Sequence, residues 1–367
     1  MMAEQIADVS RQFCIPGRFV AARSFGRGHI HESYVATYAR QGLTERYLHQ
    51  RINRHVFSDP DAVMRNILRV TEHLQNRYRA SGLPDAARRT LQVVPSLDGK
   101  ATYTTASGEC WRTYRFVEGT RSHVAATNLE QVRQAGRAFG EFQAFLADLP
   151  PPRLIETIPG FHDTRERLAA FHQAVQQDSV ARAAAARAQI EFARAHAPLA
   201  GALSDLAASG AIPERIAHHD AKLDNLLFDA RTGAAICVVD LDTVMPGLSL
   251  YDFGDMARSM VCLAAEDEDD LSRVRVDTDR FEALVRGYRE GAASLLTPTE
   301  IAHLVTAAKV ITFEQGLRFL TDHLMGDVYY RISRPGHNLI RCRNQFHLLR
   351  ELCEREDELS AVVSCTN

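Results

Sequence analysis

The stretch that decides the fold is HHDAKLDNLLFDARTGAAICVVDLD, residues 218–242. Two apolar segments, 226–228 and 234–239, flank a turn that contains a glycine, and this pattern predicts a β-hairpin. Asn225 directly precedes the first strand, and Asp240 ends the second. Because hairpin strands run antiparallel, the start of one and the end of the other share one edge. We therefore expect Asn225 and Asp240 to lie within a few ångströms of each other.

Asp220 lies on the loop just upstream of this hairpin, five positions before Asn225. Carboxylate and carboxamide oxygens are the hard ligands that Mg²⁺ prefers. A separate carboxylate can accept the proton of an attacking hydroxyl, and phosphoryl transfer requires both functions. The alternative interpretation is a set of polar residues that only cap a buried hairpin. The complete context favours catalysis, with Asp220 as base and Asn225 and Asp240 as metal ligands.

Three nearby residues receive more modest interpretations. His218 is interpreted as a packing residue that braces the loop. Asp242 is left open between a role near the metal and an ordinary surface position. Asp252 belongs to a literal Asp-Phe-Gly triplet, but it does not end the hairpin, as the metal-binding aspartate should. We interpret Asp252 as an acid that starts a helix or braces a loop.

Composition limits the classes of protein that the chain can represent. Its 367 residues favour two packed lobes, and a net charge of −3 gives no reason to expect nucleic acid or an anionic membrane as partner. The seven cysteines include no CxxC pair, which argues against a disulfide framework and a zinc site. No apolar run is long enough to cross a bilayer, and no signal-peptide core opens the chain. We expect a cytoplasmic location.

The pattern of apolar residues changes once along the chain. Residues 17–50 and 91–117 read as strands, and a helix that opens at Asp59-Pro60 separates them. From residue 129 onward most of the chain has helical periodicity. That part includes an Ala/Arg-rich segment, residues 179–197, which we interpret as a helix.

This change predicts an α+β, protein-kinase-like fold with two lobes. Residues 1–117 would form a β-rich lobe that binds nucleotide. Residues 118–367 would form a mostly helical lobe with the catalytic loop and the substrate site. The prediction places the joint near residue 118.

The first lobe has to supply the contacts to ATP. Gly26 and Gly28 lie in a turn between two expected strands, where the backbone can approach phosphate and direct N–H groups at it. An ordinary hairpin turn is the alternative. A cation should follow on the third strand, which offers Gln50 and Arg51 but no lysine. Arg51 is preferred, with Glu72 on the next helix either as its partner or as a surface residue.

These residues resemble the aminoglycoside phosphotransferase and choline kinase superfamily, which shares the protein-kinase fold. Its signature is HxDxxxxN followed by a strand that ends in the metal aspartate, and His218, Asp220, Asn225 and Asp240 match it. The chain looks still more like the N-acetylhexosamine 1-kinases. The segments that carry this closer resemblance are 26–34, 48–57, 111–119, 238–258, 318–331 and 337–345.

The resemblance implies ATP and Mg²⁺, with Phe116, Val117 and Glu118 as the hinge beside the adenine. It also places the sugar between the catalytic loop and the helical lobe. Further contacts would come from a polar cluster near the C-terminus: Arg318, Asp322, Asp327, Tyr330, Asn338 and Arg341. A buried salt-bridge network that ties the last helices together is the alternative for this cluster. His31 is a candidate substrate contact, or else a surface histidine of the hairpin.

The sequence thus predicts an ATP-dependent kinase of a free hexosamine, acting at the anomeric hydroxyl. A kinase of another small alcohol, such as an aminoglycoside or an amino alcohol, is the second option. A nucleotide-binding pseudokinase is the third, although such proteins usually lose the base or the metal ligands. Which sugar is used, and whether Gln50 or Arg51 contacts the phosphates, stays open at this point.

Overall fold

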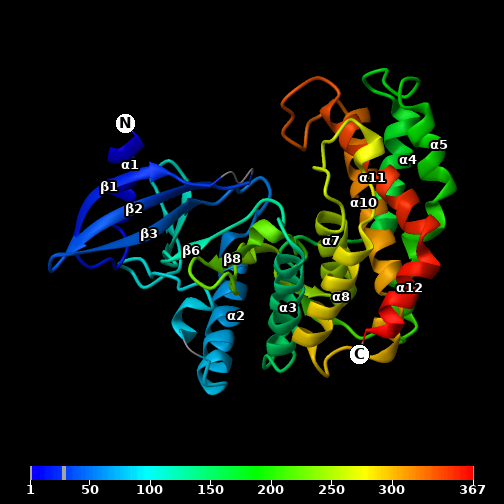
Figure 1. The fold of residues 1–367 in the computed structure, drawn as a ribbon. Helices are drawn as coiled ribbons and strands as arrows, with labels where there is room; N and C mark the ends of the chain where they lie inside the picture. Colours follow the sequence, from blue (N-terminus) through cyan, green and yellow to red (C-terminus); the bar gives the residue numbers. More distant parts are fainter. Residues whose placement is uncertain (1, 27–29, 84, 367) are drawn as a thin grey trace. The chain divides into compact units, whose positions relative to one another are not determined.

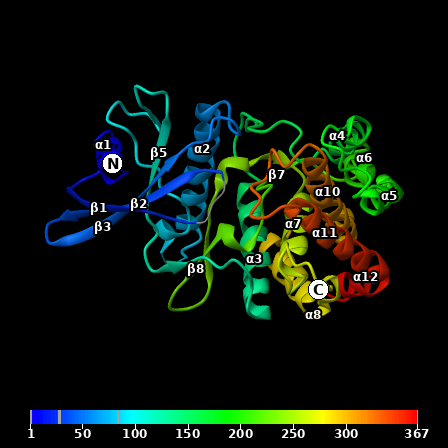
Figure 2. The same cartoon turned by 90° about the horizontal axis from the view of Figure 1, so that it is seen from above.

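The computed structural model describes residues 2–26, 30–83 and 85–366, drawn in Figures 1 and 2. They form two compact units, and each is assembled from separate stretches of chain. Unit 1 comprises Met1–Arg121, Asp148–Pro159 and Leu227–Met245, and unit 2 comprises Ser122–Ala147, Gly160–Leu226 and Pro246–Asn367. The sequence suggested one continuous boundary near residue 118. In the structure, two later stretches of the chain also belong to unit 1.

Unit 1 is built on a five-stranded antiparallel sheet with the order β1-β2-β3-β5-β4. The left-handed residues Gln41 and Gly42 join β2 to β3, as a tight hairpin turn requires. Figure 1 shows β1, β2 and β3 in blue, running side by side. The bounds of the strands are β1 (Arg18–Ser24), β2 (Glu32–Arg40), β3 (Leu43–Arg51), β4 (Tyr103–Thr104) and β5 (Cys110–Arg115).

Two helices accompany this sheet, α1 (Met2–Ser10) and α2 (Pro60–Ala80). The α2 helix starts where the sequence predicts, with Pro60 in its first turn and Asp59 accepting the backbone N–H of Ala62 at 2.9 Å. Trp111 of β5 is 1% exposed and belongs to the apolar core of the sheet. The predicted strands of unit 1 therefore pack apolar side chains into a buried core.

A second sheet in the structure contains the predicted hairpin. Its order is β6-β8-β9, with β6 (Thr120–Arg121), β8 (Leu226–Asp229) and β9 (Ala235–Val238). The backbone N–H of Asp229 donates to the carbonyl of Ala234 at 2.8 Å and closes the turn. Short 3₁₀ turns at Ala86–Arg88 and Leu241–Thr243 complete unit 1.

Unit 2 is mostly helical. Figure 2 shows α10 and α11 next to each other, with α4, α5 and α6 grouped together. Its helices are α3 (Leu129–Leu146), α4 (Thr164–Gln177), α5 (Arg187–Ala195), α6 (Ala202–Ala208), α7 (Ser249–Met260), α8 (Thr278–Ala292), α9 (Pro298–Ala302), α10 (Leu304–Leu324), α11 (His337–Glu354) and α12 (Glu356–Cys365). Its shorter elements are β7 (Arg215–Ala217), β10 (Met245–Gly247), which starts at the end of unit 1, and 3₁₀ turns at Ala197–Gly201, Leu223–Asn225 and Leu271–Arg273.

Helices α3 and α8 approach each other closely because glycines line their contact. A Cβ atom added to Gly287 or Gly291 of α8 would lie 2.0 Å from a carbonyl oxygen of α3. A Cβ atom on Gly136 or Gly140 of α3 would lie 2.5 to 2.6 Å from a carbonyl oxygen of α8. We call these four residues the glycine seam. No other residue type permits this separation of the two backbones.

The Ala/Arg-rich segment is helical in its second half only. Helix α5 begins at Arg187, and the preceding residues form turns. Asp178 ends α4 in a left-handed conformation, and its carboxylate accepts the backbone N–H groups of Arg182 and Ala183. These bonds draw the chain away from a helix, so the prediction for that half was wrong. Within the described ranges, none of the helices combines the length and hydropathy needed to cross a membrane.

Candidate active site

Loop 218–225 in unit 2 follows β7 and ends in a 3₁₀ turn. Asn225 donates from Nδ2 to the carbonyl oxygen and to Oδ2 of Asp220, at 2.8 Å each. Lys222 Nζ lies 3.0 Å from the same Oδ2, and 31% of the Asp220 side chain remains exposed. Burial opposes the ionisation of Asp220, but Lys222 and His218 outweigh it and hold its pKa below the usual value. Asp220 is thus a charged acceptor with a fixed orientation.

Asp252 of α7 holds this loop from behind. Its Oδ2 accepts the backbone N–H of His218 at 2.8 Å, and its Oδ1 accepts that of His219 at 2.7 Å. Gln143 of α3 donates to Asp252 Oδ2 at 2.6 Å and in turn accepts the Tyr288 hydroxyl at 2.6 Å. Burial raises the pKa of Asp252, against these donors. The structure confirms that Asp252 braces a loop.

His218 packs as the sequence suggested. It is fully buried, and its ring lies edge-on to Phe139 and Phe142 of α3, with centroids 5.4 and 6.0 Å away. The two phenylalanines and Asp252 together fix the start of loop 218–225. That start therefore has little freedom to move without disturbing the core of unit 2.

Loop 240–243 in unit 1 follows β9 and carries two aspartates with different environments. Asp240 is exposed and has a left-handed backbone, with φ of 60°. Asp242 is 2% exposed, and its two oxygens accept Arg112 Nη1 and Nη2 at 2.6 and 2.7 Å. Although burial opposes ionisation, Arg112 and His31 keep the pKa of Asp242 far below its usual value. Asp242 is therefore a buried structural anion rather than a surface residue.

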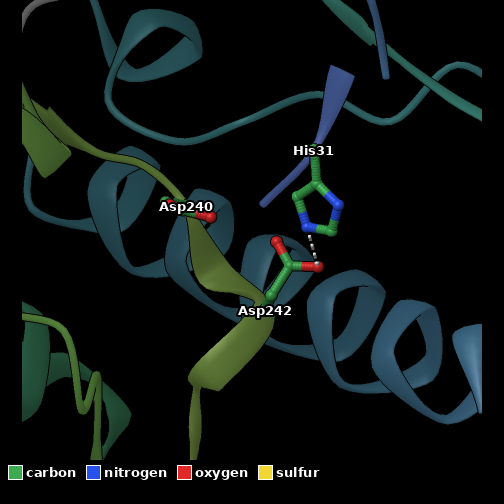
Figure 3. A group of neighbouring side chains, drawn as sticks. All are labelled: His31, Asp240 and Asp242. Atoms are coloured by element: carbon green, nitrogen blue, oxygen red, sulfur yellow. Dashed lines mark ion pairs between the residues drawn. The ribbon is translucent and has the colours of Figure 1, made fainter. Parts of the chain in front are cut away.

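His31 points toward Asp242, as Figure 3 shows, with Nε2 3.3 Å from Asp242 Oδ1. One ligand atom each from His31, Asp240 and Asp242 lies within 4.8 Å of the others, a spacing that would suit a metal. However, His31 Nδ1 accepts the backbone N–H of Asn53 at 3.1 Å. A neutral ring that accepts through Nδ1 has its proton on Nε2, so a metal at Nε2 would have to displace that proton or the bond from Asn53, which disfavours His31 as a ligand.

His31 was also a candidate for substrate contact, and its environment argues against that role. Its side chain is 6% exposed, and its ring stacks on Phe57 with centroids 5.4 Å apart. Both ring nitrogens already face a partner. His31 therefore anchors the end of the glycine turn to Asp242, and neither the substrate nor the surface interpretation fits.

The glycine turn itself is described in part. Gly26 has φ of +82°, which favours glycine, and the preceding Phe25 donates its N–H to the Ser33 carbonyl at 2.9 Å. Gly28 lies outside the described residues. The phosphate contact expected for this turn stays a prediction.

The expected partnership between Arg51 and Glu72 is wrong. Arg51 forms ion pairs with Glu32 of β2 and with Glu109, which precedes β5. The reason is the sheet register, because Arg51 pairs directly with Glu32 across β2 and β3. Glu72 is exposed on α2. Gln50, the other candidate, donates to Ser33 at 3.0 Å.

The sequence reasoning missed Arg112, which is the buried cation of this region. Arg112 is 1% exposed, pairs with Asp242, and donates from Nε to Gln50 Oε1 at 3.0 Å. A signal was available, because this arginine stands inside the buried strand Cys110–Arg115. A charge in such a strand needs a buried partner of opposite sign.

The hinge segment is held rigidly within unit 1. Phe116 donates its N–H to the Arg46 carbonyl at 3.0 Å, and the Arg46 guanidinium covers the Phe116 ring at 4.2 Å. Glu118 accepts Arg46 Nε at 2.9 Å, and its carbonyl accepts Arg88 Nη2 at 2.8 Å. The Val117 carbonyl accepts the Thr120 hydroxyl at 2.7 Å. The Glu118 carboxylate thus faces Arg46, and the adenine contact expected for this segment stays a prediction.

Asp322 of α10 holds a loop together, so its assignment to the substrate is wrong. Its oxygens accept three consecutive backbone N–H groups, those of residues 328–330, at 2.8 to 2.9 Å. Asn338 donates to the same carboxylate at 2.8 Å. Asp322 is 4% exposed. A carboxylate with four donors has no remaining role toward a sugar.

Asp327 and Arg341 belong to the same network. Asp327 accepts Arg182 Nη1 at 2.5 Å and Asn338 Nδ2 at 2.9 Å. Arg341 donates to Asn338 Oδ1 at 3.3 Å and lies over the Phe319 ring at 5.5 Å. The alternative of a buried network fits these residues, because Asn338 contacts both Asp327 and Arg341.

Arg318 and Tyr330 remain as substrate candidates. The Arg318 guanidinium lies 5.1, 6.0 and 5.8 Å from the ring centres of Phe161, Tyr329 and Tyr330. Among the described residues, no carboxylate lies within ion-pair distance of Arg318. Tyr329, which was not predicted, is 60% exposed. The group forms a cation bordered by aromatic faces, which we call the Arg318 cluster.

Comparison with known proteins agrees with this geometry. The model of the family described as "Phosphotransferase enzyme family" matches residues 22–293. A microcompartment-associated aminopropanol kinase is 15% identical, with a TM-score of 0.57, covering 97% of this chain and 98% of its own. Spectinomycin phosphotransferase, solved with ADP and spectinomycin, is 13% identical, with a TM-score of 0.55 and 100% and 98% coverage.

Choline kinase from Cryptosporidium parvum Iowa II is 12% identical, with a TM-score of 0.56, covering 97% of this chain and 96% of its own. Identities at this level establish a shared kinase-like fold and leave the acceptor open. The family match, in contrast, spans well over half of the sequence. The chain therefore belongs to the phosphotransferase enzyme family.

Proposed function

We propose that the protein transfers the γ-phosphoryl group of ATP, with Mg²⁺, to the anomeric C1 hydroxyl of a free N-acetylhexosamine. The observation that carries the proposal is the state of Asp220, an ionised and partly exposed carboxylate whose direction Asn225 and Lys222 fix. Family membership supplies the reaction class and implies ATP. The sugar as acceptor is supported by the sequence resemblance in segments 238–258, 318–331 and 337–345.

In the proposed reaction the acceptor oxygen attacks the γ-phosphorus, the bond to ADP breaks, and the hydroxyl proton passes to Asp220. The anomeric hydroxyl is the most acidic hydroxyl of a sugar, so a weak base suffices late in a loose transition state. Bound Mg²⁺ would neutralise charge on the phosphates. Asn225, through Oδ1, and Asp240 offer it hard oxygen ligands. Asn225 can offer Oδ1 to Mg²⁺ and orient Asp220 at the same time, because its Nδ2 donates to Asp220.

The nucleotide would be held by unit 1 residues. We assign the phosphates to the backbone of the turn at Gly26 and Gly28, and the adenine to the backbone of Phe116, Val117 and Glu118. The positive φ of Gly26 and the rigid hinge support these roles. Arg51 is not assigned to the phosphates, because it forms ion pairs with Glu32 and Glu109.

The sugar ring would contact the Arg318 cluster. Aromatic faces suit the apolar side of a pyranose, and a guanidinium donates to paired hydroxyls or to the N-acetyl carbonyl. A cationic acceptor would be repelled by Arg318. This charge supports a neutral sugar over an amino alcohol.

A second candidate function is a kinase of an amino alcohol or aminoglycoside. It is supported by the names of the structural relatives, which act on aminopropanol, spectinomycin and choline. Release of ADP, measured with free sugars, amino alcohols and aminoglycosides as acceptors, separates the two. Turnover restricted to amino compounds would overturn the sugar assignment.

Phosphorus NMR of the product identifies the phosphorylated position. We expect coupling of phosphorus to the anomeric proton, and no reaction with the 1-deoxy sugar. Glucose should give a clearly lower kcat/KM than N-acetylglucosamine, because a site built to bond the N-acetyl group is left with unpaired polar atoms. Coupling to the C6 methylene protons would contradict the proposal.

Substitutions test the residue roles. Asp220→Asn should lower kcat on the order of 10²–10⁴-fold with ATP binding retained. Asp240→Asn preserves the left-handed backbone, since asparagine tolerates it, and should abolish Mg²⁺-dependent ATP binding. Asp252→Ala should lower stability and leave metal–ATP affinity intact. Calorimetry that found metal–ATP affinity lost in the Asp252 variant and kept in the Asp240 variant would exchange these two roles.

A further inference from the structure

A buried histidine outside the predicted site contacts the loop that carries Asp220. His162 precedes α4 and is 8% exposed. Its Nε2 lies 3.0 Å from the carbonyl oxygen of His219, and its Nδ1 lies 2.7 Å from Glu314 Oε1. Glu314, on α10, is 1% exposed, and its other oxygen accepts the Thr164 hydroxyl at 2.6 Å. His162 therefore joins the core helix α10 to the residue that directly precedes Asp220.

The two contacts determine the protonation of His162. A carbonyl oxygen and an ionised carboxylate can only accept, so both ring nitrogens must donate and the ring is an imidazolium. Burial opposes this charge, but Glu314 outweighs it and raises the pKa of His162. The other groups that face the ring are Arg318 on α10, Tyr251 and Asp255 on α7, and the ring of His219.

His219, whose carbonyl oxygen His162 contacts, has a backbone conformation that neighbouring residues must stabilise. Its φ is 66°, a left-handed conformation that a residue with a side chain rarely adopts and that costs free energy. Asp252 accepts its N–H at 2.7 Å, on the opposite side from the carbonyl. Its ring stacks on that of His162, with centroids 5.4 Å apart and an angle of 17°. Both peptide groups of His219 and its side chain are thus fixed.

We propose that His162, charged and held by Glu314, is a positioning residue for phosphoryl transfer. It fixes the His219 carbonyl and through it the direction of the Asp220 carboxylate. The inference rests on the proposed role of Asp220 as base. A reacting group displaced by about 1 Å can lose on the order of 10²-fold in rate. The affinity for ATP should not change, because the proposed nucleotide contacts lie in unit 1 and the printed contacts of His162 lie in unit 2.

Two substitutions of His162 separate its two bonds. In His162→Gln the side-chain amide nitrogen takes the place of Nε2 and keeps a donor toward the His219 carbonyl. In His162→Asn the shorter amide takes the place of Nδ1 and reaches only Glu314. We expect His162→Asn to lower kcat about 10- to 100-fold with KM for ATP unchanged. His162→Gln should remain within about threefold of the wild-type kcat.

Glu314→Gln gives an independent readout through the pH profile. In the wild type, kcat should fall as pH rises through the raised pKa of His162, because a neutral ring can donate only one of its two bonds. In Glu314→Gln the amide can donate to Nδ1 of a neutral His162 ring, whose Nε2–H still donates to the His219 carbonyl, so this descending limb should disappear. A descending limb that persists unchanged in Glu314→Gln would overturn the proposal, even if the His162 variants fail to fold.

Lys309→Met is the matched control on the same helix. Lys309 is 9% exposed and pairs with Glu356 at 2.6 Å, so its loss should lower the melting temperature and leave kcat unchanged. Asp220→Asn is measured alongside. If Asp220→Asn retained turnover, the proposed function would fall. If Asp220→Asn lost turnover while His162→Asn kept full kcat, only the positioning role would fall.

Discussion

Two loops carry the proposed chemistry, and their neighbours hold them by different means. Loop 240–243 in unit 1 is anchored by Asp242, which is paired with Arg112. Loop 218–225 in unit 2 is anchored by Asp252 and by the pair of His162 with Glu314. Each loop contains a residue other than glycine in the left-handed region, Asp240 in one and His219 in the other. Each therefore needs external bonds to keep its shape.

The two buried cations, Arg112 and His162, differ in how they respond when their carboxylate partner is lost. Arginine stays protonated at any ordinary pH, so Arg112 cannot discharge inside the protein. Histidine can release its proton, so His162 can become neutral. A buried charge without a partner is expensive, whereas a buried neutral ring costs far less. The loop with Asp240 is thus held permanently, whereas the loop with Asp220 is held in part by a group that titrates.

The largest effect should follow from removal of the arginine. Arg112→Met leaves the Asp242 carboxylate buried without its cation, and we expect a loss of about 3–5 kcal/mol in the free energy of unfolding. Chemical denaturation measures it. The double variant Arg112→Met with Asp242→Leu should recover part of this loss. A loss below about 1 kcal/mol in the single variant would remove the basis of the comparison.

Glu314→Gln should have a smaller effect on the same quantity. His162 can discharge once the carboxylate is gone, and we expect a loss of about 1–3 kcal/mol at pH 8. The measurement is again chemical denaturation, under the conditions used for Arg112→Met. A loss equal to that of Arg112→Met would show that His162 stays charged without its partner.

The two pairs should also respond to opposite ends of the pH range. The pKa of Asp242 is lowered in the folded state, so its contribution is present above the unfolded value and lost as pH falls. The pKa of His162 is raised, so its contribution is complete below the unfolded value of about 6.5 and lost as pH rises through the folded value.

Melting temperatures of the wild type and the two variants across pH 5 to 9 check this. The gap between wild type and Glu314→Gln should narrow as pH rises, whereas the gap for Arg112→Met should widen, because a buried Asp242 without its cation can take up a proton at low pH. A gap for Glu314→Gln that widened with rising pH would contradict the assigned charge state.

The smallest effect should come from an acid of unit 1 that has an exposed position. Glu72→Gln should change the free energy of unfolding by no more than about 0.5 kcal/mol, because Glu72 lies on the exposed side of α2. KM for ATP should also stay the same, since Arg51 pairs elsewhere. A marked rise in this KM would restore Glu72 to the nucleotide site. Chemical denaturation measures the free energy of unfolding, and steady-state kinetics measures KM for ATP.

Features set by neighbouring residues were predictable from the sequence. Asp59 and Pro60 start α2, as the sequence predicts. The hairpin of β8 and β9 follows from two apolar runs and a turn. The bracing role of Asp252 was also predicted, because its place past the hairpin excluded the metal role. Caps, turns and periodicity act over a few residues, so a single sequence contains them.

Features set by distant partners were not predictable. Arg112 and Asp242 are 130 positions apart, and His162 and Glu314 are 152 apart. His31 was misjudged because its tautomer depends on the backbone N–H of Asn53. Asp322 was misjudged for the same kind of reason, since a loop backbone occupies its oxygens. Residue types reveal which groups can act, and only tertiary packing decides which ones are already engaged.

The glycine seam between α3 and α8 has a consequence for how the sequence can change. Any missense change at one of its glycines adds at least a Cβ atom. At all four positions this Cβ atom would lie within 2.6 Å of a backbone atom of the other helix. The clash is relieved only if α3 and α8 move apart. Backbone cannot step aside as a side chain can. No amino-acid substitution at these four positions should therefore be neutral. We expect the four glycines to stay unchanged during evolution while the surface residues of both helices diversify. Sequences that lose one glycine should be found only together with a changed helix spacing.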